Sequence, residues 1–185
     1  MVGAHVARRL GMDLDVVISC KIPAPGHPDL SMGAVAEGGV RHIDVGLASV
    51  LQVAPGELRG SVRAAEEELL RRVRTYRMDR PLPDLRGRVA FLVDDGIARG
   101  VSARAAVEAV RRLRPDRLVV ATPVASAFAA EALAGSADAV VALIRPAVLR
   151  SVSEWYGEFS PLQDSDVVAW LGSVPRRHED AHATA

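Results

Sequence analysis

The second half of the chain alternates short apolar segments with amphipathic ones, and this alternation restricts the fold more than any other feature. Three segments have the length and composition of strands, and the two segments between them have helical periodicity. In chain order these five segments are 88–95, 102–114, 117–125, 127–135 and 137–144. Strands that alternate with helices build a mostly parallel sheet with right-handed crossovers. We therefore predict an α/β fold with a doubly wound, mostly parallel sheet.

The first half of the chain predicts a helix, a strand, a loop, a hairpin and a long helix. The first helix is expected to end at Gly11, and the β-branched segment 15–20 is typical of a short strand. Residues 21–32 contain three prolines and a glycine, which predicts a loop, and loops of this length are usually functional or disordered. Two short strands are predicted on either side of the Gly-Gly pair at 38–39, before a helix over 55–76.

Length and charge restrict the class of protein. The chain has 185 residues, of which 49% are hydrophobic and 25% charged, as expected for one globular domain with a sizeable core. We expect this domain to cover residues 1–174 and the segment 175–185 to be a disordered tail. Because the formal net charge is zero, neither nucleic acid nor a membrane is an expected partner. A single cysteine, Cys20, and the lack of a signal peptide or a long apolar run indicate a cytoplasmic protein.

The loop after the strand 88–95 carries the most informative polar residues. It contains Asp94, Asp95, Gly96, Ile97, Ala98, Arg99, Gly100, Val101 and Ser102. In α/β sheets, ligands bind beyond the carboxyl ends of the strands. Gly96 and Gly100 permit backbone conformations closed to other residues, and the loop leads into a helix N-terminus, whose free amides favour a phosphate. We expect Ser102 to cap that helix and to donate to a phosphate oxygen.

The two adjacent carboxylates narrow the choice of ligand. Asp94 and Asp95 would repel a phosphate unless they face something else, such as a pair of sugar hydroxyls or a bound cation. A phosphorylated ribose meets both requirements. The alternative interpretation is an acidic turn followed by an ordinary helix cap.

These residues resemble a known motif. The segment VAFLVDDGIARGVSARAAVEAV resembles the phosphoribosyl pyrophosphate (PRPP) binding motif of type I phosphoribosyltransferases, which has four apolar residues, then D-D-G-x-A-T-G-x-T, then a helix. The segments KIPAPGHPDLSMGAVAEGGV, ATPVAS and EWYGEFSPLQDSDV are similar to segments of a bacterial group of predicted phosphoribosyltransferases. The similarity extends from about residue 2 to residue 172. It implies a type I phosphoribosyltransferase-like fold with a short β-hairpin and a mobile loop inserted.

The resemblance implies an activity and a role for several residues. The activity is transfer of the 5-phosphoribosyl group from PRPP to a nucleobase or similar heterocycle, with release of pyrophosphate. Asp94 and Asp95 match the pair that holds the ribose hydroxyls, and residues 98–102 match the loop that receives the 5′-phosphate. Mg²⁺ would be the cofactor, bound mainly through the pyrophosphate of PRPP.

Lys21 is the only lysine in the chain and matches the mobile catalytic loop of the family. A compact, strongly hydrated ammonium can follow the leaving pyrophosphate as charge builds there. We therefore expect Lys21, with Asp94 and Asp95, to form the catalytic set. The alternative is a surface residue at the end of a strand.

Two departures from the motif leave other functions open. Arg99 replaces the usual Thr, and its cation either binds the 5′-phosphate or blocks the turn. Family members also have a strand and a Pro-Arg-Gly-Gly-type pyrophosphate loop before the helix with which this chain opens, so the domain is expected to be N-terminally incomplete. A partner chain could pair with the exposed sheet edge, which makes a homo-oligomer an expectation. The alternatives to an enzyme are a non-catalytic PRPP- or nucleotide-binding regulatory module and a degenerate scaffold.

Three further residues are candidates for contact with the acceptor, whose identity the sequence does not reveal. Trp155 and Tyr156 follow the last predicted strand, where their rings would either stack on a planar acceptor or cover the core. Glu37 is a candidate for positioning the acceptor.

Overall fold

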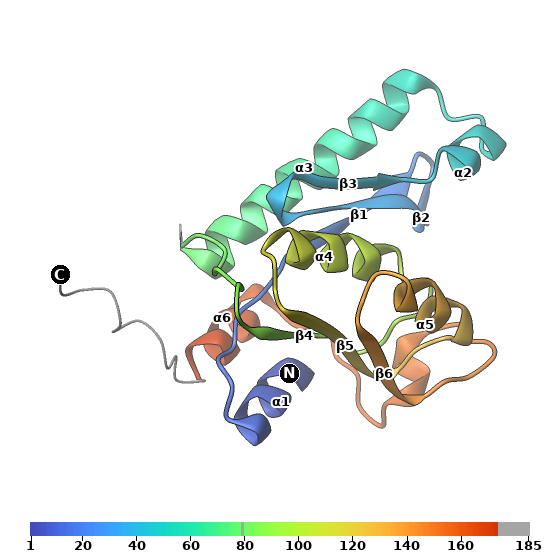
Figure 1. Ribbon diagram of the computed structural model, residues 1–185. Coiled ribbons are helices and arrows are strands. Elements are labelled where there is room, and N and C mark those ends of the chain that lie inside the picture. The colour runs from blue at the N-terminus through green and yellow to red at the C-terminus, as the bar shows by residue number, and fades with distance from the viewer. Residues whose placement is uncertain (79, 174–185) are drawn as a thin grey trace.

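The computed structural model describes residues 1–78 and 80–173, whose strands form two separate three-stranded sheets (Figure 1). The expected tail, 175–185, lies outside the described residues. The helices are α1 (Val2–Leu10), α2 (Val45–Val50), α3 (Pro55–Arg77), α4 (Val101–Arg112), α5 (Ala127–Ala134) and α6 (Asp164–Gly172). The strands are β1 (Ser19–Ala24), β2 (His27–Ala36), β3 (Val40–Ile43), β4 (Val89–Val93), β5 (Arg117–Val124) and β6 (Ala139–Ile144), and two 3-10 helices are η1 (Glu37–Gly39) and η2 (Val152–Trp155).

The second half of the chain forms a parallel sheet in the order β4-β5-β6, with α4 and α5 as the connections between its strands. Phe91 pairs with Val119 across β4 and β5, and Ala121 pairs with Val141 across β5 and β6. One face of this sheet packs on the two helices. Leu118 of β5, Val107 of α4 and Leu133 of α5 belong to the buried apolar cluster between them. The predicted α/β fold with a parallel sheet is confirmed.

The first half forms an antiparallel sheet in the order β1-β2-β3. Figure 1 shows this sheet between the long helix α3 and the helix α4, so α4 lies between the two sheets and contacts both. Ile22 and Met32 are fully buried in the core under α3, where they pack with Leu69. The two short strands predicted around residues 38–39 are confirmed as the end of β2 and β3, with η1 between them.

The prediction of a loop over residues 21–32 is wrong, because these residues form the hairpin of β1 and β2. The hairpin turns at Pro25-Gly26, where Gly26 has φ 73°, and Ala24 pairs with His27 across it. A proline followed by a glycine with positive φ is typical of a type II turn. Pro23 lies at a shift of register on β1, which is an edge strand, and edge strands and bulges are the places where a sheet tolerates proline. The prolines therefore shape the hairpin and do not break it.

The predicted strand over residues 15–20 starts late, since β1 begins only at Ser19. Side chains bind the backbone of the preceding residues in place of a neighbouring strand. The Ile18 N–H donates to Glu37 Oε2 at 2.7 Å, and the Arg77 guanidinium donates to the Val16 carbonyl. This backbone is paired, but with groups that no periodic pattern reveals.

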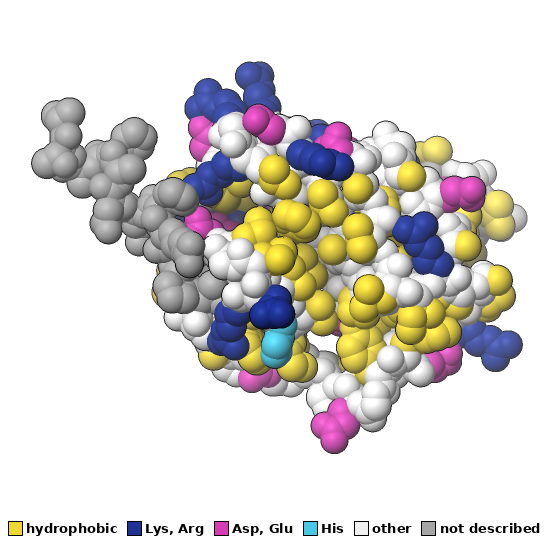
Figure 2. All heavy atoms as spheres, turned by 60° about the horizontal axis from the view of Figure 1, so that its bottom comes forward, with side chains coloured by type: hydrophobic (Ala, Val, Ile, Leu, Met, Phe, Trp, Pro, Cys, Tyr) yellow, Lys and Arg dark blue, Asp and Glu magenta, His cyan; other side chains and the backbone are white. Residues whose placement is uncertain are grey.

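The face of the parallel sheet opposite α4 and α5 is largely apolar, and Figure 2 shows hydrophobic side chains gathered on that side of the molecule. Exposed side chains on its strands include Val89 and Phe91 of β4 and Val141 and Leu143 of β6. Helix α1 covers the end of this face near Val93 and ends, as predicted, at Gly11 with φ 63°. Within the described ranges, none of the helices combines the length and apolar character needed to cross a bilayer.

Candidate functional site

The acidic pair stands at the carboxyl end of β4, where the strand order predicts a ligand site. The Asp94 N–H donates to the Ala121 carbonyl at 3.1 Å, which continues the ladder between β4 and β5 by one residue. The Asp95 N–H donates to Asp94 Oδ1 at 2.9 Å, so the two side chains share one tight turn. Asp94 is half-buried and Asp95 is exposed. The structure thus places both carboxylates at the rim of the parallel sheet.

Burial and the neighbouring Asp95 carboxylate raise the pKa of Asp94 from 3.8 to about 7. Both causes disfavour the charged form, because the ionised Asp94 loses hydration and meets a second negative charge. The Lys21 ammonium acts in the opposite direction and lowers this pKa, so it lies within electrostatic range of Asp94. Lys21 is exposed on β1, opposite Ala34 of β2. The structure therefore brings the lone lysine of the antiparallel sheet towards the acidic pair of the parallel sheet.

The loop after the acidic pair is anchored to the neighbouring strand β5. The Ile97 N–H donates to the Val124 carbonyl and the Ser126 N–H donates to the Ile97 carbonyl, both at 2.9 Å. Ser126 Oγ donates to the Ala98 carbonyl at 2.6 Å and accepts from the Ala129 N–H, which caps α5. Ser126 is a residue of this site that sequence reasoning missed, although a serine between a strand and a helix is a typical cap signal.

The expectation that Ser102 caps α4 is wrong, because Gly100 is the capping residue and Ser102 lies inside the first turn. Gly100 has φ 74°, a left-handed conformation that favours glycine, and an added Cβ would lie 3.4 Å from the Ala129 Cβ. The Gly100 carbonyl accepts from the Arg104 N–H at 2.8 Å, so the helix starts at once after the glycine. The first amides of α4 have no partner within the helix, and Ser102 is the second residue of that first turn.

Gly96 is needed for space and not for an unusual backbone angle. Gly100 has a positive φ, whereas Gly96 does not. A Cβ at Gly96 would lie 2.4 Å from Val152 Cγ1, so a side chain there would require Val152 to shift. Val152 belongs to η2, far along the chain, so this contact has no local signal in the sequence.

The predicted acceptor residues lie in two different places. Tyr156 is at the acidic loop, where its hydroxyl donates to the Asp95 carbonyl, and Trp155 beside it is partly exposed. Glu37 is buried, and its Oε1 accepts from Arg77 Nε at 2.8 Å while its Oε2 accepts from the Ile18 N–H. These contacts give Glu37 a structural role, and its role towards an acceptor stays a prediction.

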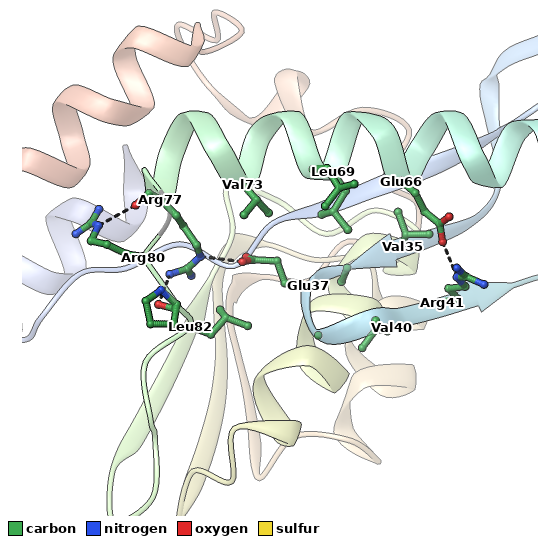
Figure 3. Close-up of a pocket in the computed structure, with 15 residues that line it drawn as sticks. Val35, Glu37, Val40, Arg41, Glu66, Leu69, Val73, Arg77, Arg80 and Leu82 are labelled. Carbon is green, nitrogen blue, oxygen red and sulfur yellow. Dashed lines mark hydrogen bonds and ion pairs between the residues drawn. The ribbon is translucent and has the colours of Figure 1, made fainter.

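Glu37 also lines a pocket of about 580 Å³ between α3 and the antiparallel sheet (Figure 3). In this pocket Leu69 and Val73 of α3 face the apolar side chains of β2 and β3, with the Glu37–Arg77 and Arg41–Glu66 ion pairs on either side. None of the residues that line it belongs to the loop 94–102. The structure therefore does not bring Glu37 together with the acidic pair.

The side chains that could hold a metal ion at the acidic loop are carboxylates, the ligands that Mg²⁺ prefers. Among the described residues, no group of three or more His, Cys, Asp or Glu side chains is arranged to hold a metal. Asp94 and Asp95 alone would leave most of a magnesium shell to a ligand or to water.

The amino-acid sequence was compared with those of known proteins. No family model matches the chain. Proteins from two strains of Mycobacterium tuberculosis, CDC 1551 / Oshkosh and ATCC 25618 / H37Rv, are both named "Putative phosphoribosyl transferase" and are 35% identical over 182 residues. The match covers 98% of this chain and 41% of each relative, so the chain spans about two fifths of their length.

A solved structure is also similar. The crystal structure of TT1426 from Thermus thermophilus matches with 41% identity and a TM-score of 0.69. The match covers 91% of this chain and 79% of TT1426, so the two proteins share most of their fold.

Proposed function

We propose that this chain, which is similar over nearly its whole length to proteins named putative phosphoribosyl transferase, transfers the 5-phosphoribosyl group from PRPP to a nucleobase or similar heterocycle and releases pyrophosphate. One observation carries the proposal: Asp94 and Asp95 directly follow β4 and open the loop that leads to the glycine-capped N-terminus of α4. Two acceptor groups for a sugar diol and a set of free amides for a phosphate are thereby held on one loop.

The two ends of the loop bind different parts of the ribose phosphate. The ionised carboxylates of Asp94 and Asp95 accept hydrogen bonds from the 2′ and 3′ hydroxyls, and a hydrogen bond to a charged acceptor is stronger than a neutral one. The first amides of α4 and the Ser102 hydroxyl donate to the 5′-phosphate. Arg99 is exposed on the same loop and adds a cation on the phosphate side.

Transfer breaks the bond between the anomeric carbon and pyrophosphate and forms a bond from that carbon to an acceptor nitrogen. The ribose ring carries positive charge between the two events, and the acceptor gives up one proton. Lys21 follows the charge that builds on the leaving pyrophosphate, because its ammonium is a compact charge with no fixed geometry. Bound Mg²⁺ would neutralise part of the pyrophosphate charge. The raised pKa of Asp94 means that diol binding should strengthen as pH rises through about 7.

A second candidate function is a PRPP-binding module without turnover. The position of Glu37 favours it, because the buried ion pair with Arg77 takes this residue away from the acidic loop and removes one expected acceptor contact. A degenerate scaffold that binds no PRPP is the remaining alternative.

The test is calorimetric binding of PRPP with Mg²⁺ to the protein and to Asp94→Asn/Asp95→Asn. Loss of two charge-assisted hydrogen bonds should weaken PRPP binding by about 100-fold or more. The matched control is Asp84→Asn/Glu67→Gln, which removes two carboxylates from exposed ion pairs and should bind as the wild type does.

Turnover then separates the candidates. Pyrophosphate release with a panel of nucleobases supports the transferase, and PRPP binding without release supports the regulatory module. Equal PRPP binding by the wild type and by the double variant at the acidic pair would refute the site assignment.

A further inference from the structure

A segment from late in the chain lies on the acidic loop. We call residues 151–159 the strap; it contains η2 and the aromatic residues that follow it. The Val152 methyl groups occupy the place where a side chain at residue 96 would be, since a Cβ there would lie 2.4 Å from Cγ1 and 2.6 Å from Cγ2. The strap therefore approaches the loop as closely as a glycine allows.

Tyr156 fastens the strap to the loop by a hydrogen bond. Its hydroxyl donates to the Asp95 carbonyl at 2.5 Å. Burial and the nearby Asp95 and Asp94 carboxylates raise the pKa of Tyr156, so the phenol keeps its proton and remains a donor. The Phe159 ring lies 5.3 Å from the Tyr156 ring and supports it.

The hydrogen bond acts on the peptide unit that joins Asp95 to a glycine. Gly96 must lack a side chain to admit Val152, and a glycine leaves its backbone more freedom than any other residue. A change of backbone conformation at Asp95 and Gly96 would alter the path of the turn that carries the two carboxylates. The Tyr156 hydroxyl holds the carbonyl of Asp95, and Val152 packs against Gly96 at the position that a side chain would occupy.

We propose that Tyr156 is a positioning residue, which together with Val152 holds the Asp94–Asp95 turn in the geometry that binds a sugar diol. It acts through the backbone, and this role differs from both that the sequence suggested for it, which were stacking on the acceptor and covering the core. The inference rests on the proposed function for the identity of the ligand. The restraint on the loop follows from contacts within the chain and does not depend on the proposed function.

The test compares Tyr156→Phe with Tyr76→Phe. The control removes an equivalent hydroxyl from a different part of the molecule, because Tyr76 lies on α3 and donates to Asp164 Oδ1 at 2.6 Å. Two quantities are measured for each variant: the amide hydrogen exchange rate of the peptide 94–100 without ligand, and the PRPP affinity in the presence of Mg²⁺. Loss of one hydrogen bond predicts about fivefold faster exchange in that peptide and about fivefold weaker PRPP binding for Tyr156→Phe. Neither quantity should change in Tyr76→Phe.

A second pair of variants tests the packing contact. Gly96→Ala should displace Val152 and weaken PRPP binding more than Tyr156→Phe does. Gly96→Ala combined with Val152→Ala should recover part of that loss, because the added methyl then meets only the Val152 Cβ position at 3.0 Å. Additive losses in the double variant would show that the two residues do not act together and would count against the proposal.

The exchange measurement separates failure of this inference from failure of the proposed function. If the wild type does not bind PRPP, the proposed function is refuted, and the exchange rates alone decide whether Tyr156 restrains the loop. If Tyr156→Phe exchanges and binds as the wild type does, or if Tyr76→Phe changes the loop equally, the positioning role is overturned.

Discussion

The raised pKa of Asp94 makes a prediction about stability that does not depend on any ligand. An acid whose pKa is higher in the folded chain than in the unfolded chain is held more easily in its protonated form when folded. For Asp94 the pKa rises from 3.8 to about 7, so ionisation opposes folding. Stability should therefore fall as pH increases from about 4 to 7, and the loss is complete above that range. Asp94→Asn removes the charge and should relieve this loss.

The magnitude follows from the pKa difference. Each pKa unit corresponds to about 1.4 kcal/mol, so between pH 5 and pH 8 the ionisation of Asp94 costs up to about 3 kcal/mol. Solvent reaches the half-buried carboxylate and screens part of this cost, which leaves about 2 kcal/mol. For a chain of this length, that free energy corresponds to a change of about 4–8 °C in melting temperature.

The assay is thermal unfolding of the wild type and Asp94→Asn at pH 5 and pH 8, at one ionic strength. We expect Asp94→Asn to gain stability relative to the wild type mainly at pH 8. Asp84→Asn is the control, because its Arg86 partner lowers the pKa of Asp84 to about 2, so this residue is ionised at both pH values. An equal effect of Asp94→Asn at the two pH values would refute the argument that burial and Asp95 disfavour the charged form.

Two further predictions concern single side chains. Lys21→Ala should lower the rate of transfer more than it weakens PRPP binding, measured by single-turnover kinetics beside calorimetry, and equal losses would contradict a leaving-group role. Glu37→Ala leaves the buried Arg77 guanidinium without its Oε1 partner and should cost about 3–5 kcal/mol in denaturant unfolding. Glu66→Ala, at the more exposed ion pair of the same pocket, should cost less than about 1 kcal/mol. Unchanged stability with lost turnover in Glu37→Ala would instead support its predicted role towards the acceptor.

The structure explains why the hairpin was missed. Three prolines and a glycine in residues 21–32 are typical of a loop when each is read alone. Their effect depends on which edge of which sheet they occupy, and Pro23 is tolerated because β1 is an edge strand. That information is absent from the local sequence.

The helix cap at Gly100 was missed for a related reason. Ser102 is the residue type that usually caps a helix, but the backbone turns at Gly100 because α5 packs closely on it through Ala129. Tertiary packing here places the cap two residues before the serine that the local sequence favours.

The sequence by itself determined the alternation of strands and helices from 88 to 144 and the position of the acidic pair at a strand end, because hydrophobic periodicity and turn residues act over a few residues. Only the tertiary structure decided what surrounds that pair. Three interactions at the pair join residues that lie far apart along the chain. They are the contact of Val152 with Gly96, the hydrogen bond from Tyr156 to Asp95, and the electrostatic effect of Lys21 on the pKa of Asp94. Such contacts depend on how the sheets and the strap pack, and no short-range pattern encodes them.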